Sequence, residues 1–490
     1  MRDLVLAIDQ GTTGTTAMVV DRDVRVLAKR NVTFTNHYPK PGHVEHDVKE
    51  IWISVEGAVK GALHAAGVDV NRIGAIGITN QRETSLFWDP ATGEAIHRAL
   101  VRQDRRTADR CRALKDAGHE QLFKDRTGLV LDPYFSGTKA AWLLDNVPGA
   151  RARAEAGEIV FGTIDTWLAW RLTGEHVTDP SNASRTLMMD LQTRAWSSQL
   201  CGLLGVPMAC LPKIVPSSGV VGHTKGISFL PDGIPVAGLI GDQQGALFGQ
   251  AAFSPGLAKC TYGTGAFVLL NTGTEPVPSQ HGMLTTVAWQ LGDEVLYALE
   301  GSAFIAGAAV QWIRDGLHLI DNAAEIEALA AQVPDSGGVV FVPAMAGLGA
   351  PHWRPDARGL VSGITRGTTK AHLARAVLDG VALQLCDILE AMASDMGKPL
   401  AELRVDGGAS ANNLLMQRQA DLLGVACVRP TVLETTGLGS ALLAGLATGL
   451  WGSLDEIAAA WNEDRRFEPA GDADEIAEAR AAWDVAVAKA

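Results

Sequence analysis

The sequence predicts an α/β protein made of two related domains, and three observations carry that prediction. The chain has 490 residues, which is more than a single hydrophobic core usually organises. Residues 4–21 form two apolar runs around a short turn of Gly and Thr, the pattern of a β-hairpin with buried strands. Residues 256–270 show the same pattern about half a chain later, which indicates a duplication. We therefore expect one domain over residues 1–250 and a second over residues 251–490.

Composition narrows the class of protein. With 47% hydrophobic and 20% charged residues, the chain can bury large cores. Its formal net charge of -13 argues against a nucleic-acid partner, which would need a basic face. The six cysteines lack metal-ligand spacing and are expected to be buried thiols in a reducing cytosol. No apolar run approaches the length of a membrane span, so we expect a cytoplasmic protein without membrane insertion.

The turn of the first hairpin, Gly11 to Gly14, has the chemistry of an anion site. Glycines let the backbone approach an anion closely, and Thr12 and Thr13 add hydroxyl groups and N–H donors. Asp9 ends the preceding strand and faces the same place. A carboxylate repels a phosphate unless a cation lies between them, so we expect Mg²⁺ here, held largely through water. No Lys and no helix follow the glycines, which excludes the Lys-containing phosphate loop; an ordinary tight hairpin is the structural alternative.

The second hairpin turns at Gly263, Thr264 and Gly265. One such turn from each domain, facing the other across a cleft, can clamp a nucleoside triphosphate. Asp242 comes at a strand end between the two hairpins, where a carboxylate can accept the proton of a hydroxyl group that attacks a γ-phosphoryl group. We therefore predict Asp242 as a general base. The structural alternative is that Asp242 only caps a helix that starts near Gln244.

The other elements follow from hydrophobic periodicity and from capping residues. In the first half we expect a third strand over 24–35, a helix over 47–67 capped by Asp47, a buried strand over 73–79, helices over 108–114 and 140–144, a strand and then a helix capped near Thr163 within 159–170, a strand that ends at 241 and a helix over 246–252. In the second half we expect a helix over 303–315, a loop over 346–351, a helix over 370–393, a strand over 403–406, a loop over 407–410, a helix over 412–423 and a helical surface cap after 454.

Several loops after these strands carry polar or small residues, and open α/β sheets bind ligands at the carboxyl ends of their strands. Arg82 and Glu83 follow the strand over 73–79 and can hydrogen-bond a small polyol. Tyr134, in the loop over 132–139, offers a phenol donor, although a loop Tyr is often only packed. Gly408 allows a flat nucleotide base to approach the backbone, or else it only serves a turn.

Six segments together resemble the FGGY family of carbohydrate kinases. They are Asp9-Gln-Gly-Thr-Thr, Gly77-Ile-Thr-Asn-Gln-Arg-Glu-Thr, Asp132-Pro-Tyr-Phe-Ser-Gly-Thr-Lys, Gly241-Asp-Gln-Gln, Tyr262-Gly-Thr-Gly and Val405-Asp-Gly-Gly-Ala, and the resemblance runs from about Leu4 to Trp451. It implies two actin/hexokinase-like (ribonuclease H-like) domains that close over ATP and Mg²⁺ in a catalytic cleft. It also implies transfer of the γ-phosphoryl group to a terminal hydroxyl of glycerol, giving sn-glycerol 3-phosphate. The expected assembly is a homo-oligomer, either a dimer or a tetramer.

The resemblance assigns roles position by position. The residues assigned to the polyol are Arg82, Glu83, Tyr134, Asp242 and Gln243, with Asp242 as the base. Those assigned to the nucleotide are Thr12, Thr13, Gly14, Thr264, Gly307, Gln311, Gly408 and Asn412. Asp9 and Asp242 are assigned to the metal region, and Phe267 matches an aromatic residue that contacts the carbon side of the polyol.

Two positions depart from the pattern of family members that act on glycerol. Thr16 stands where those members carry an Arg, which removes a cation that can steady the γ-phosphate. Arg102 stands where they carry a Trp that packs on the carbon chain together with the aromatic residue matching Phe267. A guanidinium there weakens packing on three carbons and favours an extra hydroxyl. A kinase of a longer polyol, such as a tetritol, is therefore the alternative within the family.

Two further expectations concern regulation and the class of protein. The loop over 226–233 lacks the Gly-rich, Arg-ended pattern of fructose 1,6-bisphosphate control, and Ser228 stands near where some relatives carry a phosphorylated His. We expect neither control. The alternative from another class is a nucleotide-dependent switch, either an actin-like filament former or a heat-shock-type ATPase, which would hydrolyse ATP without a polyol. Too little chain follows the repeat for the peptide-binding domain of such a chaperone.

Overall fold

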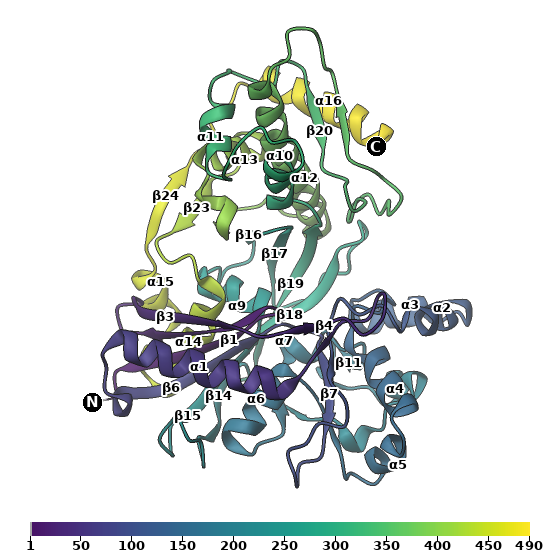
Figure 1. Ribbon diagram of the computed structural model, residues 1–490, viewed down its shortest axis with the longest axis vertical. Helices are drawn as coiled ribbons and strands as arrows, with labels where there is room; N and C mark the ends of the chain where they lie inside the picture. Colours follow the sequence, from purple (N-terminus) through teal and green to yellow (C-terminus); the bar gives the residue numbers. More distant parts are fainter. Residues whose placement is uncertain (1) are drawn as a thin grey trace.

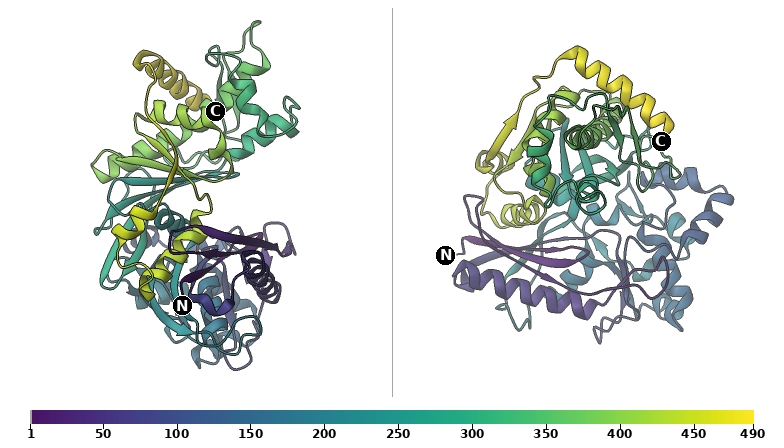
Figure 2. Two further views of the ribbon diagram at one scale, coloured as in Figure 1. Left: turned by 90° about the vertical axis from the view of Figure 1, so that its left-hand side faces the viewer. Right: turned by 45° about the horizontal axis from the view of Figure 1, so that its top comes forward.

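The computed structural model describes residues 2–490, and its core is one mixed sheet of 13 strands that runs through both halves of the chain (Figure 1). Within this sheet, the strands of the two halves are joined by a single residue pair, Ser218 and Leu291. Two lobes joined at a narrow waist result, as the side view in Figure 2 shows. In spatial order the strands are β24 (Glu463–Phe467), β23 (Cys427–Pro430), β22 (Glu402–Asp406), β16 (Leu257–Tyr262), β17 (Ala266–Gly273), β19 (Glu294–Ala303), β18 (Leu284–Leu291), β14 (Ser218–His223), β15 (Pro235–Gly241), β6 (Ile73–Asn80), β1 (Leu4–Gln10), β2 (Gly14–Val20) and β3 (Val26–Thr33).

The pairing of these strands confirms the predicted duplication. β1 pairs antiparallel with β2 and parallel with β6, and β16 pairs antiparallel with β17 and parallel with β22. Each hairpin continues into a third antiparallel strand, β3 in the first half and β19 in the second. Each half also adds a further parallel strand, β15 beside β6 and β23 beside β22. The two halves therefore have the same strand order around the same hairpin.

Two helices cross where the lobes join. α9 (Asp242–Gly249) follows the last strand of the first half, and α14 (Thr435–Thr448) comes from the second half but packs on β1, β6 and β15. Glycines allow the close crossing: a Cβ on Gly249 would lie 2.0 Å from the carbonyl oxygen of Thr435, and one on Gly439 would lie 1.9 Å from that of Gly245. α14 therefore packs a segment from the second half of the sequence against the sheet of the first half.

The rest of the first lobe surrounds the N-terminal sheet. α1 (Val48–Ala66) packs on β2 and β3, and Asp47 caps it as predicted, since its side chain accepts the N–H of Lys49. A smaller five-stranded sheet has the order β4 (Asn36–His37), β5 (Glu45–His46), β8 (Ala99–Leu100), β7 (Ser85–Trp88) and β9 (Val160–Thr163). Further helices are α2 (Ala108–Asp116), α3 (Glu120–Thr127), α4 (Ser136–Asn146), α5 (Ala150–Glu155), α6 (Ile164–Thr173), α7 (Pro180–Ala183) and α8 (Ser198–Leu204). Two short strand pairs are β10 (Val177–Thr178) with β13 (Lys213–Ile214) and β11 (Met189–Asp190) with β12 (Ala195–Trp196).

The second lobe is built around its own sheet and one long helix. α12 (Lys370–Met396) packs against α13 (Asn413–Leu423), and both lie over the core that β16 and β17 help to form. The other elements are α10 (Gly307–Asp315), α11 (Glu325–Ala330), β20 (Val340–Val342), β21 (Leu360–Ser362), α15 (Leu454–Ala460) and α16 (Ala473–Lys489).

Three predicted element boundaries are wrong. The loop over 132–139 gives way to α4 at Ser136, because the Ser136 hydroxyl bonds the carbonyl oxygen of Glu83 and fixes this turn in place. The helix expected over 246–252 is α9, which starts at Asp242, where a carboxylate suits the positive end of the helix dipole. The helix expected from Ala303 starts only at Gly307, because Ala303 ends β19, a strand paired on both sides. Thr163 precedes α6 as predicted, but its side chain bonds Asp165 instead of capping the helix.

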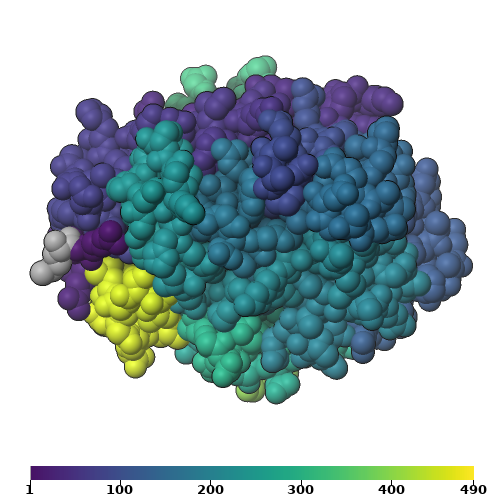
Figure 3. Space-filling view, turned by 90° about the horizontal axis from the view of Figure 1, so that it is seen from below, coloured from purple at the N-terminus to yellow at the C-terminus, as the bar shows by residue number. Residues whose placement is uncertain are grey.

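The chain after 454 is also more than the expected helical cap. β24 adds an edge strand to the main sheet beside β23 and separates α15 from α16. Just before α15, the Trp451 ring donates to the carbonyl oxygen of Arg22, 3.0 Å away. Seen from below, the yellow C-terminal part lies beside the purple N-terminal residues (Figure 3). Glu456 of α15 also accepts a hydrogen bond of 3.3 Å from Arg22, so the tail contacts both lobes.

Within residues 2–490, no helix is both long and apolar enough to cross a membrane. All six cysteines are buried and free, as the sequence predicted.

Candidate active site

Three parallel strands end at the same edge of the first sheet. β1, β6 and β15 are in register at Gln10, Asn80 and Gly241. The residues that follow them include the predicted turn of the first hairpin, the pair Arg82 and Glu83, and Asp242. Strand register therefore brings Arg82, Glu83 and Asp242 to one edge of the sheet.

Asp242 lies between two guanidinium groups. Its Oδ1 is 3.2 Å from Nε of Arg82, and its Oδ2 is 3.5 Å from Nη1 of Arg102. Gly241, not Asp242, is the N-cap of α9, and Asp242 Oδ1 accepts the N–H of Gln243 from within the first turn. The capping alternative is therefore wrong, and the carboxylate belongs to a charged cluster.

A buried ion-pair network holds the Arg82 guanidinium in place. Arg82 donates to both carboxylate oxygens of Glu300, at 2.5 and 2.9 Å, and Arg185 donates to Glu300 at 3.0 Å and to Glu83 at 2.8 Å. Although burial alone would raise it, the two arginines lower the pKa of Glu300 to about 2. Glu300 belongs to the second lobe and its partners to the first. The network therefore joins the two lobes beneath Asp242.

Sequence reasoning missed Glu300 and Arg185. Glu300 is a single charged residue in the apolar run of β19, and a buried carboxylate needs a partner, so this residue carried a usable signal. Arg185 follows a short helix and has no local pattern of its own.

Three buried polar atoms of this cluster lack a hydrogen-bond partner within residues 2–490. They are Nε of Arg82, which contacts Asp242 only as an ion pair, Oε2 of Glu83 and Nη1 of Arg185. Leaving such groups unpaired is costly, and Glu83 also holds a positive φ of 63°. A donor and acceptor set of this kind suits the hydroxyl groups of a small polyol.

The other predicted acceptor residues surround the same cluster. Burial raises the pKa of Tyr134, and Arg102, Glu83 and Arg82 are the charges that act on it most strongly. Lys139 holds the Tyr134 loop by donating to the carbonyl oxygens of residues 133, 134 and 135. Phe267, from the second lobe, has its ring centre 6.0 Å from the Arg102 guanidinium carbon.

Gln243 lies on the same cluster with its side chain already engaged. Its Oε1 accepts a hydrogen bond of 2.5 Å from the buried Lys259 of β16, which also donates to Thr261. Sequence reasoning missed Lys259, a single cation in an apolar strand. The pair links α9 to the first strand of the second hairpin.

Asp9 is the second carboxylate of the site. Burial and the nearby charge of Asp242 raise the pKa of Asp9 to about 7. Within residues 2–490, no three His, Cys, Asp or Glu side chains gather as a direct metal cage. Two neighbouring carboxylates beside a turn with the chemistry of an anion site fit Mg²⁺ held mainly through water.

A pocket of about 460 Å³ lies in the second lobe. Its lining includes every predicted nucleotide residue of that lobe, namely Thr264, Gly307, Gln311, Gly408 and Asn412. Apolar residues such as Val310, Leu378 and Leu415 complete the walls. The size and the mixture of apolar and polar groups suit a nucleotide.

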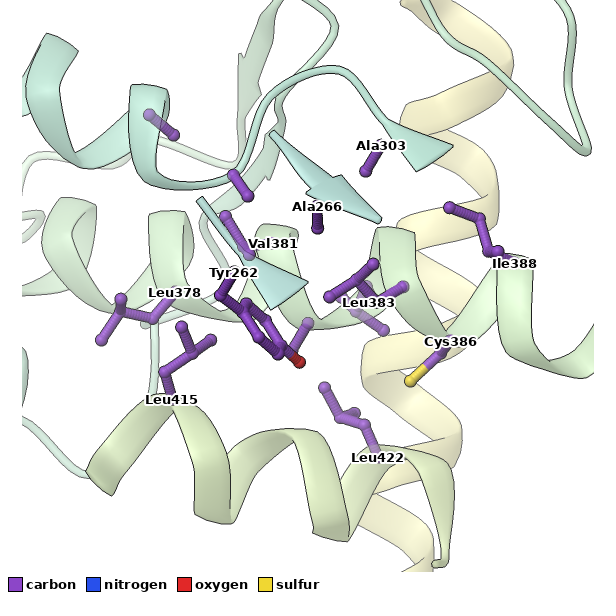
Figure 4. Packing of buried hydrophobic residues seen from close by; sticks show 14 of the residues in the cluster. Tyr262, Ala266, Ala303, Leu378, Val381, Leu383, Cys386, Ile388, Leu415 and Leu422 are labelled. Carbon is purple, nitrogen blue, oxygen red and sulfur yellow. The ribbon is translucent and has the colours of Figure 1, made fainter. Parts of the chain in front are cut away.

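The pocket is shaped by the second hairpin. Tyr262 packs between α12 and α13, near Leu378 and Leu415 (Figure 4), and its hydroxyl donates to Gln419 over 2.9 Å. Gly307 comes so close to the turn that a Cβ there would lie 2.6 Å from the carbonyl oxygen of Gly263. Asn412 caps α13 by accepting the N–H of Leu415. The predicted residues are thus fixed by the core beneath them.

Thr12, Thr13 and Gly14 lie outside this pocket. They form the turn of the first hairpin, where the N–H of Gly11 donates to the carbonyl oxygen of Gly14. Gln81, the residue after β6, braces the turn by donating to the carbonyl oxygen of Gly11. The structure therefore brings Asp9 and Asp242 together, but it gives the two hairpins separate surroundings.

Comparison with known proteins covers the whole chain. The profile of the FGGY family of carbohydrate kinases, N-terminal domain, matches residues 4–249, and that of the C-terminal domain of the family matches residues 258–448. Glycerol kinase of Myxococcus xanthus is 58% identical, over 99% of this chain and 99% of its own length. Glycerol kinases of Burkholderia vietnamiensis and Bordetella parapertussis are 54% and 56% identical, over 99% and 98% of this chain and 97% and 95% of their own lengths.

Solved structures agree with this result. The crystal structure of Plasmodium falciparum glycerol kinase with ADP superimposes with a TM-score of 0.94 and 36% identity, over 99% of this chain and 98% of its own. A xylulose kinase from Rhodospirillum rubrum, at 23% identity and a TM-score of 0.88 over 99% of this chain and 98% of its own, shares the fold. The predicted actin/hexokinase-like fold is confirmed. The chain belongs to the FGGY family of carbohydrate kinases.

Proposed function

We propose that this enzyme transfers the γ-phosphoryl group of ATP to glycerol and forms sn-glycerol 3-phosphate. The observation that carries the proposal is the surroundings of Asp242, a carboxylate placed between two guanidinium groups and close to a second carboxylate. Relatives named glycerol kinase, 54–58% identical over nearly the full chain, support glycerol as the acceptor. They favour glycerol over a longer polyol as the main substrate, and over an actin-like ATPase.

The acceptor binds, in this proposal, against Arg82, Glu83 and Tyr134. Nε of Arg82, which makes no hydrogen bond although it lies 3.2 Å from Oδ1 of Asp242, donates to one hydroxyl oxygen, and the unpaired Oε2 of Glu83 accepts a hydroxyl proton. Asp242 accepts the proton of the terminal hydroxyl as its oxygen attacks phosphorus. Gln243, tied to Lys259, orients α9 and with it the carboxylate of Asp242. The Arg82–Glu300 pair fixes the acceptor in place, because both groups are buried.

The nucleotide binds in the pocket of the second lobe. Gly408 lets the base approach the backbone, and Thr264, Gly307, Gln311 and Asn412 contact the sugar and phosphates. Thr12, Thr13 and Gly14 meet the phosphates from the first lobe as the lobes close, which excludes water from the reaction. Mg²⁺, held near Asp9 and Asp242, supplies charge neutralisation to the transferring phosphoryl group.

Three further expectations accompany this function as proposals. The boundary between the two domains lies near residue 250, just after α9. The enzyme works in the cytoplasm, which six buried free thiols support. It assembles as a homo-oligomer, either a dimer or a tetramer.

The test is a coupled assay with purified protein. ADP release should require both ATP and glycerol, and sn-glycerol 3-phosphate should form in equal amount. Removal of divalent cations with EDTA should abolish turnover, and added MgCl₂ should restore it. ATP hydrolysis at the same rate without glycerol would contradict the proposal and favour an ATPase switch.

A further inference from the structure

Arg102 differs from every other charged group around Asp242 in the number of donors it keeps unused. Within residues 2–490, its guanidinium makes one side-chain hydrogen bond, a long one of 3.5 Å to Asp242. Arg82, by contrast, donates to Glu300 and Gln244 and also pairs with Asp242. A guanidinium has five N–H donors, so Arg102 keeps most of its capacity for a ligand.

Those donors belong to the acceptor site. Leu100, two residues before Arg102, pairs across the small sheet with Ser85, two residues after Glu83. This register sets Arg102 beside Glu83, and the guanidinium reaches both Asp242 and the Phe267 ring. Burial alone lowers the pKa of Arg102, but Tyr134, Asp242 and Glu83 raise it. The group is therefore a permanent cation, and its side chain is only 15% exposed.

The charge balance decides what kind of ligand group suits it. Three guanidinium groups of the cluster face three carboxylates, those of Glu83, Asp242 and Glu300. Asp9 adds a further acidic group nearby, and Lys259 adds a further cation, so the charges of the cluster stay balanced. An anionic acceptor would find no spare positive charge, whereas a neutral hydroxyl group needs only donors. The cluster therefore suits a neutral polyol.

We propose that Arg102 is a specificity residue that lets this enzyme phosphorylate four-carbon polyols in addition to glycerol. It donates to a hydroxyl group that lies beyond the third carbon, a group that glycerol lacks. This inference rests on the proposed function, because it concerns the acceptor of the same reaction. If Arg102 only props Asp242, its loss affects all acceptors equally.

The experiment compares acceptors within each variant. We would measure kcat/KM with ATP for glycerol, erythritol, threitol and D-glycerate in the full-length protein, Arg102→Leu and Arg102→Lys. Arg105→Leu is the matched control, since Arg105 lies on the same loop but pairs with Asp132 at the surface. The ratio of tetritol to glycerol kcat/KM cancels any common effect on Asp242.

We expect Arg102→Leu to lower that ratio about 10- to 100-fold, mainly through a higher KM for the tetritol, as for the loss of a charged hydrogen bond. Arg102→Lys should lower the ratio of tetritol to glycerol kcat/KM less than Arg102→Leu does, and Arg105→Leu should leave this ratio unchanged. An unchanged ratio in Arg102→Leu overturns the inference, as does wild-type protein that phosphorylates glycerol but neither tetritol. D-glycerate used better than both tetritols overturns the neutral-polyol assignment. If the wild-type protein turns over none of the four acceptors, the proposed function itself is refuted.

Discussion

The two hairpin turns of this molecule share one pattern but differ in what surrounds them. In both, a Gly N–H donates to the carbonyl oxygen of the Gly that starts or precedes the next strand, at 2.9 Å. Thr12 and Thr13 stand between the two glycines in the first turn, and Thr264 alone in the second. Both turns therefore close with the same hydrogen bond between two glycines, and the first turn is one residue longer than the second.

The side chains around the two turns have diverged. Two residues before Gly11 lies Asp9, a half-buried carboxyl near the charge of Asp242. Two residues before Gly263 lies Thr261, and the turn opens onto a pocket with largely apolar walls. The difference teaches that a duplicated scaffold can separate two tasks: the acidic side suits a cation and proton transfer, and the neutral side suits a nucleotide.

Of the three substitutions, Asp242→Asn should lower the activity most. The amide keeps the shape and the hydrogen bond from Gln243 but cannot accept a proton, so kcat should fall by about 10² to 10⁴. ADP affinity, which depends on the other lobe, should change little. Steady-state kinetics with glycerol and calorimetric titration with ADP measure both quantities. Unaltered turnover would refute Asp242 as the base.

Asp9→Asn should change how the free energy of unfolding depends on pH. Asp9, with its pKa of about 7, holds a proton in the native protein over the range where the unfolded chain, with its ordinary value of 3.8, has lost it. The native state binds more protons there, so this carboxyl lowers the free energy of unfolding as the pH rises from about 4 to 7. Above that range the cost is complete, up to about 4 kcal/mol at 1.4 kcal/mol per pKa unit.

Asp9→Asn should therefore be more stable than the wild type at pH 8 without Mg²⁺, and the difference should disappear near pH 4. Urea unfolding at several pH values measures this, and MgCl₂ should raise wild-type stability at pH 8 but not that of the variant. Asp23→Asn, at an exposed carboxyl of the same three-stranded meander, is the control and should match the wild type both in its stability at pH 8 and in its response to MgCl₂. A variant less stable than the wild type at pH 8 would contradict the assignment of Asp9 to a cation site.

The same contrast explains what could be predicted from sequence. Both hairpins, the strand that ends at Gly241 and the residues Arg82, Glu83 and Asp242 follow from local patterns, because strand ends and turns have local signatures. The Glu300 partner of Arg82 is 218 residues away, and only the pairing of the two lobes brings it near. Helix starts at Asp242 and Gly307 were misjudged for the same reason, since tertiary contacts set them.

The pocket shows the same limit. Gly408 and Asn412 could be identified from a strand followed by a turn, but the apolar walls could not, because Val310, Leu378 and Leu415 come from three helices packed on Tyr262. A residue in a continuous apolar pattern gives no sign of whether it faces a core or a ligand. Most of the candidate site residues that were found from sequence follow the end of a strand, whereas Glu300 and Lys259, which were missed, lie within strands.

Of the three substitutions, Thr264→Val should change the kinetic and binding constants least, and it tests the second turn alone. The substitution keeps the shape of the side chain and removes one hydroxyl from the pocket, so ADP affinity should fall about threefold to tenfold, the worth of one neutral hydrogen bond. The KM for glycerol should stay unchanged, because Arg82, Glu83 and Asp242 follow strands of the first lobe. Thr274→Val, exposed beyond the far end of β17, should leave both constants as they are. A Thr264→Val protein with altered glycerol KM and normal ADP affinity would mean that the two turns do not divide the substrates between them.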